Sequence, residues 1–250
     1  VLARRNPVGT IESSRGCVYG CVYCNKKTFG RRFRTKSAAR VVDEFAHLQA
    51  SGFGEVHVWE DMFSTDLQRA KDICDELVRR RLDVCWQIDC GVRVVSVDDD
   101  LFDMTRHALR YQVAFGYESG NQQILDRMKK GITLEDSIRA TEMAKRAGLE
   151  TIGFFMLGLP GETEQTMQET IDFAIRLDPD YAKTTLLTLY PGTEITEEWK
   201  AEGRIRSEDW ARYNDHTPSR VYDHPNLDWE TLDRYYNLFY RRFYLRPGYI

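Results

Sequence analysis

The sequence lacks any apolar run close to the roughly 20 residues that a membrane-spanning helix requires. Nothing at its start has the basic and then apolar pattern of a secretory signal peptide. It also lacks an excess of positive charge, because 39 Asp and Glu outnumber 35 Lys and Arg and leave a formal net charge of -4. An acidic protein has no general attraction to nucleic acid or to an acidic membrane face. We therefore expect no nucleic-acid partner and no membrane partner.

Cysteine is also scarce, and its distribution argues against disulfides. Of the six cysteines, three fall within the eight residues from Cys17 to Cys24. A chain of 250 residues can bury a sizeable core without covalent staples. We therefore expect a reducing, cytoplasmic compartment. The chain begins with Val1 rather than Met and enters its first predicted element almost at once, so we interpret it as a piece of a longer protein.

Apolar runs of strand length alternate with amphipathic helical patterns as far as Leu189. The predicted strands are Thr10–Ser14, Glu55–Trp59, Val84–Asp89, Tyr111–Tyr117, Thr151–Leu157 and Tyr181–Leu189. The clearest helical patterns lie between them, at Ser37–Ala50, Asp66–Arg81 and Thr163–Leu177. Local signals for helix ends agree with this order: two pairs resemble capping boxes and two glycines lie where helices should stop, namely Thr133 with Asp136, Thr163 with Thr166, Gly52 and Gly148.

Six βα repeats in series predict a parallel sheet with right-handed crossovers. Six repeats are too few for the closed eight-stranded barrel, so the predicted fold is α/β, an open partial (β/α)6 TIM-like barrel over residues 1–195. Residues 196–250 are predicted to form a helical extension packed on the barrel, with an aromatic amphipathic helix at Leu227–Leu245. In such folds the ligand site lies at the carboxyl ends of the strands.

The segment Cys17-Val-Tyr-Gly-Cys21-Val-Tyr-Cys24 directly follows the first predicted strand. Thiolates spaced four and three residues apart on a short loop can converge on one metal centre. A structural zinc site needs four ligands, usually as two separated pairs. Three thiolates suit an iron–sulfur cube, because they leave one iron open to a chelating ligand. The alternative is a zinc site completed by a distant His57 or Cys90.

The Cys-x3-Cys-x2-Cys pattern, with aromatic Tyr23 before its last cysteine, resembles that of the radical S-adenosylmethionine (SAM) superfamily. Further motifs fall in the order typical of that family, each at the end of a predicted strand: residues 60–63, 115–120, 155–163 and 190–193. The chain is most similar to the branch that includes cobalamin-dependent enzymes, as the Ser-Arg-Gly lead-in before Cys17 and the closing Phe-Tyr-x-Arg-Pro also indicate.

This resemblance implies that Cys17, Cys21 and Cys24 hold a [4Fe–4S] cluster whose open iron binds the amino and carboxylate groups of SAM. Electron transfer from the cluster would break SAM and give a 5′-deoxyadenosyl radical, which takes hydrogen from a carbon of a small-molecule substrate. Flavodoxin or ferredoxin would supply the electron. Cobalamin, held by a domain outside this chain, is a further cofactor that the branch implies. Methyl transfer and ring formation are both open as outcomes.

The resemblance also implies the residues that bind SAM. Glu60 or Asp61 matches the position that holds the amino group, although the family's usual Gly-Gly-Glu is absent here. Glu118 matches a residue at the ribose or methionine end, and its alternative role is to cap the helix that starts near Asn121. Arg93 could reach the SAM carboxylate or form a surface ion pair.

The adenine end of SAM is implied at the fifth predicted strand. Gly158 and Leu159 match the strand edge against which adenine packs. Tyr23 matches a backbone contact to adenine, while its ring could equally be part of the core. The basic and aromatic stretch Lys26–Arg34 could be read as a nucleic-acid strip, but in a net acidic chain we favour a loop that shields the cluster or contacts a partner domain.

Two other functions remain open from the sequence. The first is a methylthiotransferase-like radical SAM enzyme, although the additional cluster domain and RNA-binding barrel of those enzymes are not found in this sequence. The second is an iron–sulfur or zinc scaffold that binds partners without catalysis. That scaffold would be expected to keep its cysteines and lose one of the SAM-side elements, whereas here the strand-end motifs occur together.

Overall fold

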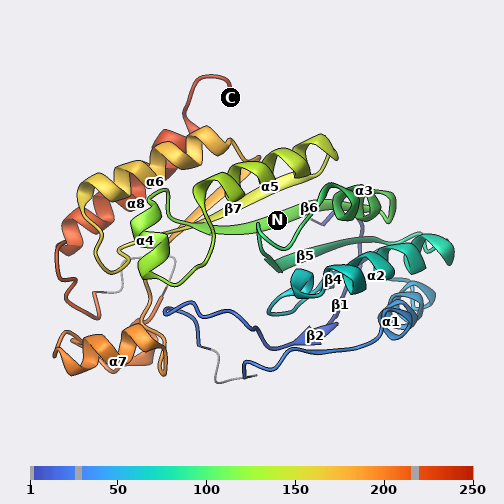
Figure 1. Cartoon of the computed structure of the whole chain (residues 1–250), viewed down its shortest axis with the longest axis horizontal. Coiled ribbons are helices and arrows are strands. Elements are labelled where there is room, and N and C mark those ends of the chain that lie inside the picture. Colours follow the sequence, from blue (N-terminus) through green and yellow to red (C-terminus); the bar gives the residue numbers. More distant parts are fainter. Residues whose placement is uncertain (1–2, 26–29, 215–219, 250) are drawn as a thin grey trace. The chain divides into compact units, whose positions relative to one another are not determined.

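The computed structural model describes residues 3–25, 30–214 and 220–249, and their fold is α/β (Figure 1). Six strands form one sheet in the order β1-β4-β5-β6-β7-β8, and a two-stranded sheet pairs β2 with β3. The strands are β1 (Val8–Ile11), β2 (Ser14–Arg15), β3 (Arg34–Thr35), β4 (Glu55–Val58), β5 (Cys85–Val92), β6 (Arg110–Glu118), β7 (Glu150–Leu157) and β8 (Tyr181–Leu186). Each of the six predicted strands corresponds to a strand of the large sheet, although the first lies at Val8–Ile11 instead of Thr10–Ser14, and the prediction of an α/β fold with a parallel sheet is correct. The β2–β3 ladder was not predicted, because two-residue strands show no periodicity.

Helices connect the strands and begin where local signals place them. They are α1 (Ala38–Ala50), α2 (Leu67–Arg79), α3 (Asp99–His107), α4 (Gln122–Arg127), α5 (Leu134–Arg146), α6 (Glu164–Leu177), α7 (Glu194–Ala201) and α8 (Trp229–Tyr244), with short 3₁₀ turns at Phe63–Thr65 and Trp210–Arg212. The capping box of Thr163 with Thr166 is present at α6. Asp136 N–H donates to Thr133 Oγ1 over 3.0 Å, and Thr133 N–H returns a 2.9 Å bond to the Asp136 carboxylate. These reciprocal bonds satisfy amides that the first turn of a helix leaves unpaired.

The chain divides into two compact units. The first contains Val1–Val18, Phe29–Gly116 and Ile138–Ile152, and the second contains Tyr19–Thr28, Tyr117–Ser137 and Gly153–Ile250. Strands β6 and β7 contribute residues to both units.

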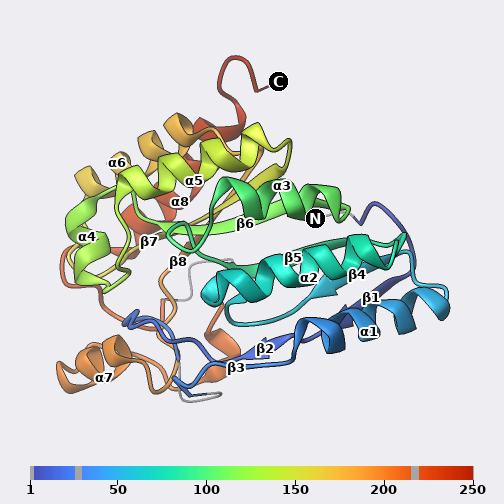
Figure 2. The same ribbon diagram turned by 45° about the vertical axis from the view of Figure 1, so that its right-hand side comes forward.

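In the first unit, α1, α2 and α3 lie in a row along β1, β4 and β5 (Figure 2). β1 pairs in parallel with β4, and β4 with β5, so that Val58 lies opposite both Ile11 and Ile88. Phe45 of α1 meets Trp86 of β5 edge to face, with ring centroids 5.9 Å apart, and both side chains are fully buried. Aromatic pairs of this geometry add to the stabilisation from buried area.

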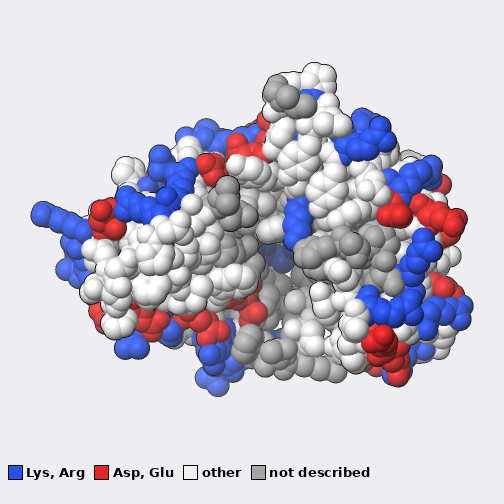
Figure 3. Space-filling model, turned by 180° about the vertical axis from the view of Figure 1, so that it is seen from behind, with Lys and Arg blue, Asp and Glu red and all other residues white. Residues whose placement is uncertain are grey.

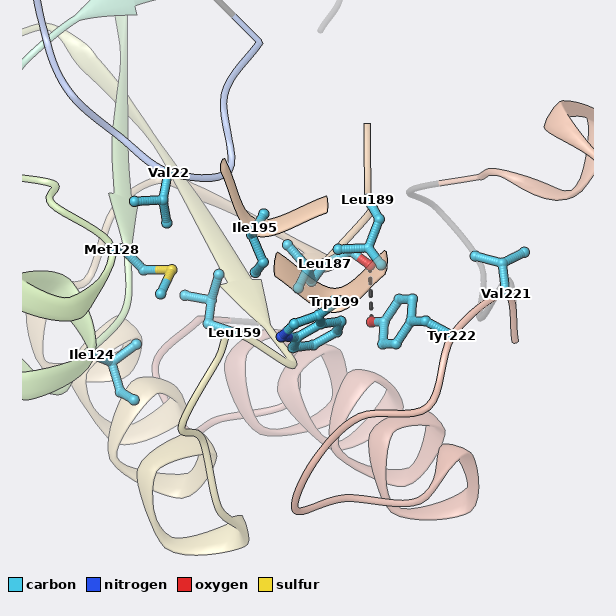
Figure 4. Packing of buried hydrophobic residues seen from close by; sticks show 10 residues of the cluster. All are labelled: Val22, Ile124, Met128, Leu159, Leu187, Leu189, Ile195, Trp199, Val221 and Tyr222. Carbon is cyan, nitrogen blue, oxygen red and sulfur yellow. Dashed lines mark hydrogen bonds between the residues drawn. The ribbon is translucent and has the colours of Figure 1, made fainter. Parts of the chain in front are cut away.

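The second unit has its own apolar core, drawn in Figure 4. Trp199 of α7 packs on Tyr222 at a centroid distance of 5.1 Å. The Tyr222 hydroxyl donates to the carbonyl of Leu187 over 3.0 Å, which satisfies its only polar group in a dry environment. Val22, from the cysteine segment, lies in the same cluster. The core thus fixes one end of that segment.

Helix α8 packs against α6 and against the edge strand β8. Two of its tyrosines bond to the strand backbone. The Tyr244 hydroxyl donates to Ala182 O at 2.7 Å and accepts from Ala182 N at 3.1 Å. The Tyr240 hydroxyl does the same with Thr184, at 3.0 and 3.3 Å. The two tyrosines are about one helical turn apart, and their partners are two residues apart on the strand. These two separations are similar, so both tyrosines can bond to the strand at once.

Lys and Arg side chains stand among Asp and Glu side chains on the face drawn in Figure 3. Within the described part of the chain, no helix combines the length and the apolar character needed to cross a bilayer.

Candidate functional site

The cysteine segment follows β2 and is held from both sides of Val22. Val22 N–H donates to Met128 O at 3.1 Å, and Val22 O accepts from Ile195 N–H at 3.3 Å. Cys21 is buried, Cys17 is partly exposed and Cys24 is exposed. Cys17 belongs to the first unit, and Cys21 and Cys24 belong to the second. Over the described residues, no three His, Cys, Asp or Glu side chains are grouped so that they could hold a metal ion.

The chemistry of this donor set fits an iron–sulfur cluster. Cys17, Cys21 and Cys24 are thiols rather than disulfides. A thiol must lose its proton to become a metal ligand, so its environment decides its suitability. Burial raises the pKa of Cys74 in α2 to about 12, which makes that thiol inert. Cys74 is fully buried among apolar residues of the core.

Glu60 follows β4 and is buried on two serine hydroxyls. Its Oε2 accepts from Ser13 Oγ at 2.7 Å and from Ser14 Oγ at 2.6 Å. Burial raises the pKa of Glu60, and the two hydroxyls oppose that rise. Arg69 of α2 fixes this arrangement by donating to Ser13 O at 2.8 Å and to Ser13 Oγ at 2.9 Å. The carboxyl group therefore sits in a prepared position beside the start of the cysteine segment.

Asp61, the neighbour of Glu60, has a different role. Its side chain is exposed and Oδ2 accepts from Gly16 N–H at 2.7 Å, one residue before Cys17. Gly16 has φ +88°, and a Cβ there would lie 2.4 Å from the carbonyl oxygen of Arg32. Only glycine fits such a position. Asp61 thus holds the backbone of the residue before Cys17 in place. Glu60 is therefore the better candidate for binding an amino group.

Glu118 ends β6 and makes two short contacts through one oxygen. Oε1 accepts from Lys130 Nζ at 2.6 Å and from the Tyr23 hydroxyl at 3.0 Å. Lys130 Nζ also lies 3.3 Å from that hydroxyl. Helix α4 is capped by Asn121, whose side chain accepts from Ile124 N–H, so the alternative role of Glu118 as the helix cap is wrong.

Arg93 follows β5 and is buried, with 5% of its surface exposed. Its backbone N–H donates to Ser64 Oγ at 3.4 Å. The alternative of a surface ion pair is therefore wrong, because the guanidinium is not at the surface.

Gly158 and Leu159 form the exit from β7. Gly158 has φ +77°, and a Cβ there would lie 3.1 Å from the Leu232 side chain. Leu159 is fully buried; its N–H donates to Glu162 Oε2 at 2.9 Å, and its carbonyl lies 3.1 Å from His224 Nε2. Glu162 itself is fully buried, and burial raises its pKa to about 8, against hydrogen bonds from the amides of Leu159 and Gly158.

His57 and Cys90 are the residues that the zinc alternative requires, and the basic stretch is the other alternative to be located. The His57 ring lies 2.9 Å from Glu55 Oε1 and also contacts Gln87, so it is already engaged within the sheet. The side chain of Cys90 lies outside the described residues, as do Lys26–Phe29 of the basic stretch.

Sequence reasoning missed Lys130, Arg69 and the role of Glu162. Lys130 stands beside Lys129 in a turn after α4, and nothing local distinguishes the buried lysine from the exposed one. Glu162 ends a recognisable Gly-Leu-Pro-Gly-Glu turn, which was the one available signal.

Comparison with known proteins identifies the relatives of this chain. The Radical SAM superfamily profile matches residues 11–174. An uncharacterized methyltransferase of Pyrococcus horikoshii is 34% identical over 243 residues, which cover 96% of this chain and 52% of that protein. The anaerobic magnesium-protoporphyrin IX monomethyl ester cyclase of Rubrivivax gelatinosus is 30% identical over 239 residues, covering 95% and 42%.

Among solved structures, the radical S-adenosylmethionine methyltransferase TsrM from Kitasatospora setae, with cobalamin and a [4Fe–4S] cluster bound, is similar in fold. Its TM-score is 0.73 at 26% identity, covering 81% of this chain and 41% of that chain. The present chain thus spans about half the length, or less, of the relatives it matches.

Proposed function

The chain belongs to the radical SAM superfamily, and we propose that it binds a [4Fe–4S] cluster and SAM and starts radical chemistry on a carbon of a small-molecule substrate. The observation that carries this proposal is the three-thiol segment Cys17–Cys24, which lies within the matched region and directly after the first strands. When bound, cluster and SAM supply a one-electron cleavage of the sulfonium C–S bond that yields a 5′-deoxyadenosyl radical. The protein contributes placement and exclusion of water.

The side chains divide this work among themselves. Cys17, Cys21 and Cys24 are proposed as the cluster ligands. Glu60, held by the Ser13 and Ser14 hydroxyls, is proposed to accept a hydrogen bond from the SAM amino group. Asp61 orders the residue before Cys17 instead of binding SAM.

The remainder of SAM is assigned to three other strand ends. Arg93 is the proposed partner of the SAM carboxylate, and Glu118 accepts from the ribose or methionine end. Gly158 and Leu159 are the proposed strand edge against which adenine packs, and Tyr23 is proposed to contact adenine through its backbone.

Methyl transfer and ring formation are the reaction outcomes proposed for the longer protein, in line with the relatives named above. Cobalamin would be held by a domain beyond this chain. Residues 196–250 are proposed as an extension of the 1–195 core.

The direct test is anaerobic reconstitution with iron and sulfide, then dithionite and SAM, with 5′-deoxyadenosine measured by chromatography. We expect brown protein with about four irons per chain, since a [4Fe–4S] cluster contains four, together with 5′-deoxyadenosine formation. Running the assay with and without methylcobalamin tests whether 5′-deoxyadenosine formation depends on cobalamin, which would assign the chain to the cobalamin branch. A protein that holds the cluster and binds SAM without ever cleaving it would contradict the proposal.

The electron is proposed to come from an acidic carrier protein, a flavodoxin or ferredoxin, that docks on residues 30–40. This segment carries five cations and no acidic residue in a chain of net charge -4: Arg31, Arg32, Arg34, Lys36 and Arg40. All but Lys36 are exposed; Lys36 and Arg40 pair with Glu44, so Arg31, Arg32 and Arg34 are the cations that the docking proposal uses. The Arg32 carbonyl lies against Gly16, next to Cys17, so this basic surface adjoins the cysteine segment. Opposite charge would speed the encounter.

Reversing two of these charges should separate protein-driven from chemical reduction. In the Arg31→Glu/Arg32→Glu variant, we expect 5′-deoxyadenosine formation with reduced flavodoxin to slow about tenfold or more at low salt. The rate with dithionite should not change. The Arg241→Glu/Arg242→Glu variant of α8 is the matched control, with equal charge reversal elsewhere. Equal slowing with both reductants would place the defect in the cluster and not in docking.

A further inference from the structure

The second unit holds a buried lysine, a buried glutamate and a partly buried tyrosine in mutual contact. Lys130 and Glu118 are each 8% exposed, and the ammonium lies 2.6 Å from Oε1. The Tyr23 hydroxyl completes the group, 3.0 Å from the same oxygen. The three come from separate segments: the cysteine segment, the end of β6 and the turn after α4. A buried carboxylate with a cation and a phenol on one oxygen is fixed in place.

The two oxygens of Glu118 are used unequally. Both contacts are made to Oε1. No described residue forms a hydrogen bond with Oε2. Among the described residues, Oε2 is also not one of the fully buried polar atoms that lack a partner, so it keeps some exposure to solvent. The Glu118 side chain keeps 11% of its surface exposed. Oε2 is thus a carboxyl oxygen that accepts no bond from a described residue, on a group whose other oxygen is held in place.

The backbone at Glu118 supports the same conclusion. Glu118 has φ +66°, a left-handed conformation that is costly for a residue with a Cβ, so contacts around it must hold it there. The turn is held by Ser119 N–H, which bonds Tyr117 O at 2.9 Å. Gly120 N–H bonds Thr170 Oγ1 at 3.0 Å, and a Cβ on Gly120 would lie 2.5 Å from Phe173. The surroundings therefore impose this direction on the Glu118 side chain.

We propose that Lys130 is a positioning residue for SAM: it fixes Glu118 Oε1, so that Oε2 is presented to a hydroxyl or ammonium donor of the bound molecule. The inference rests on the proposed function and deepens it. Lys130 does not touch the ligand. It acts through Glu118. Both side chains also contact the hydroxyl of Tyr23, the residue before Cys24, so the group is linked to the cysteine segment. Without its ammonium, a nearly buried carboxyl group would lose its cationic partner and would no longer be held in one orientation.

A double-mutant cycle on ligand affinity tests this coupling. The variants are Lys130→Met, Glu118→Gln and the pair, in the cluster-loaded chain, with dissociation constants measured by equilibrium dialysis. S-adenosylhomocysteine is the probe, because it lacks the sulfonium and is not cleaved. We expect each single variant to bind about tenfold or more weakly, as for one charge-assisted hydrogen bond. In the Glu118→Gln background, Lys130→Met should add less than about twofold, because the residue that it positions is already neutral.

Matched variants separate positioning from folding. Lys129→Met removes the neighbouring exposed lysine, which pairs with Glu194, and should leave affinity unchanged. Lys130→Arg keeps the charge and should restore affinity to within about threefold of wild type. If Lys130→Met fails to fold, Lys130→Arg and Lys130→Gln carry the comparison. 5′-Methylthioadenosine, which lacks the amino-acid part, is the second probe: weaker binding of both probes assigns Oε2 to the ribose, and weaker binding of the first alone assigns it to the amino group.

Additive losses in the cycle, or an unchanged affinity in both single variants, would overturn the inference. Either result leaves the proposed function standing as long as wild-type protein forms 5′-deoxyadenosine. Failure of that reaction in wild type, with normal coupling in the cycle, would instead contradict the proposed function alone.

Discussion

Replacing Cys21 by Ala is expected to abolish the visible absorbance of the cluster and to reduce 5′-deoxyadenosine formation by about a hundredfold or more. Mutating a residue that only hydrogen-bonds to a metal ligand already lowers metal affinity or activity about 10- to 100-fold. Cys21 is the buried member of the three thiols. With two thiolates left, a cube would expose two irons to solvent and be lost. Iron content and absorbance after reconstitution measure the first effect, and chromatography measures the second.

The matched control is Cys85→Ala, which removes a buried thiol from the start of β5. It should keep both the cluster and SAM cleavage, apart from a modest loss of stability. Retention of cluster and cleavage in Cys21→Ala would sink the assignment of the three cysteines. Loss of both in Cys85→Ala would point to a general folding defect.

Glu162→Gln should change how stability depends on pH. Burial raises the pKa of Glu162 to about 8 from its ordinary value of 4.5, so the folded chain keeps its proton at neutral pH while the unfolded chain does not. The stabilisation from that proton is complete below about pH 4.5 and is lost as pH rises through 8. The free energy of unfolding of wild type relative to Glu162→Gln should therefore fall between pH 5 and 8, by at most about 1.4 kcal/mol per pH unit.

Urea unfolding of both proteins without cluster, at pH 5.5, 6.5, 7.5 and 8.5, measures this difference. Glu164→Gln, which removes an exposed carboxylate from the first turn of α6, is the control for the loss of one acidic side chain. Parallel stability curves for wild type and Glu162→Gln would show that Glu162 is ionised in the folded chain. A neutral Glu162 matters for the site, because its carboxyl group holds the Leu159 amide at the proposed adenine surface.

Much of the fold could be predicted because its signals are local. Alternation of apolar runs gave all six main strands, and side chains three residues apart gave the caps, as at Thr163 and Thr166. The first strand was misplaced by a few residues: it was predicted at Thr10–Ser14 and is observed at Val8–Ile11, because Ser14 belongs to the short β2 ladder instead. A two-residue pairing between segments 20 residues apart leaves no trace in a periodic pattern.

The candidate site was predictable where the chemistry is written in spacing, as in the three cysteines. It was not predictable where distant segments meet. The choice between Glu60 and Asp61 depends on which one reaches Ser13 and which one reaches Gly16. Burial of Lys130 beside Glu118, 12 positions earlier, follows from tertiary packing, which a single sequence does not display.

The tyrosine ladder of α8 has a consequence for how this protein behaves among other proteins. A sheet margin with unpaired amides and carbonyls invites strands from neighbouring molecules, and such pairing is a common start of aggregation. Along β8, the groups of Ala182 and Thr184 are already bonded to phenol hydroxyls. At these two residues the edge strand has no unpaired backbone group with which a strand of another molecule could pair. Side-chain hydroxyls therefore protect this edge of the sheet in place of a further strand.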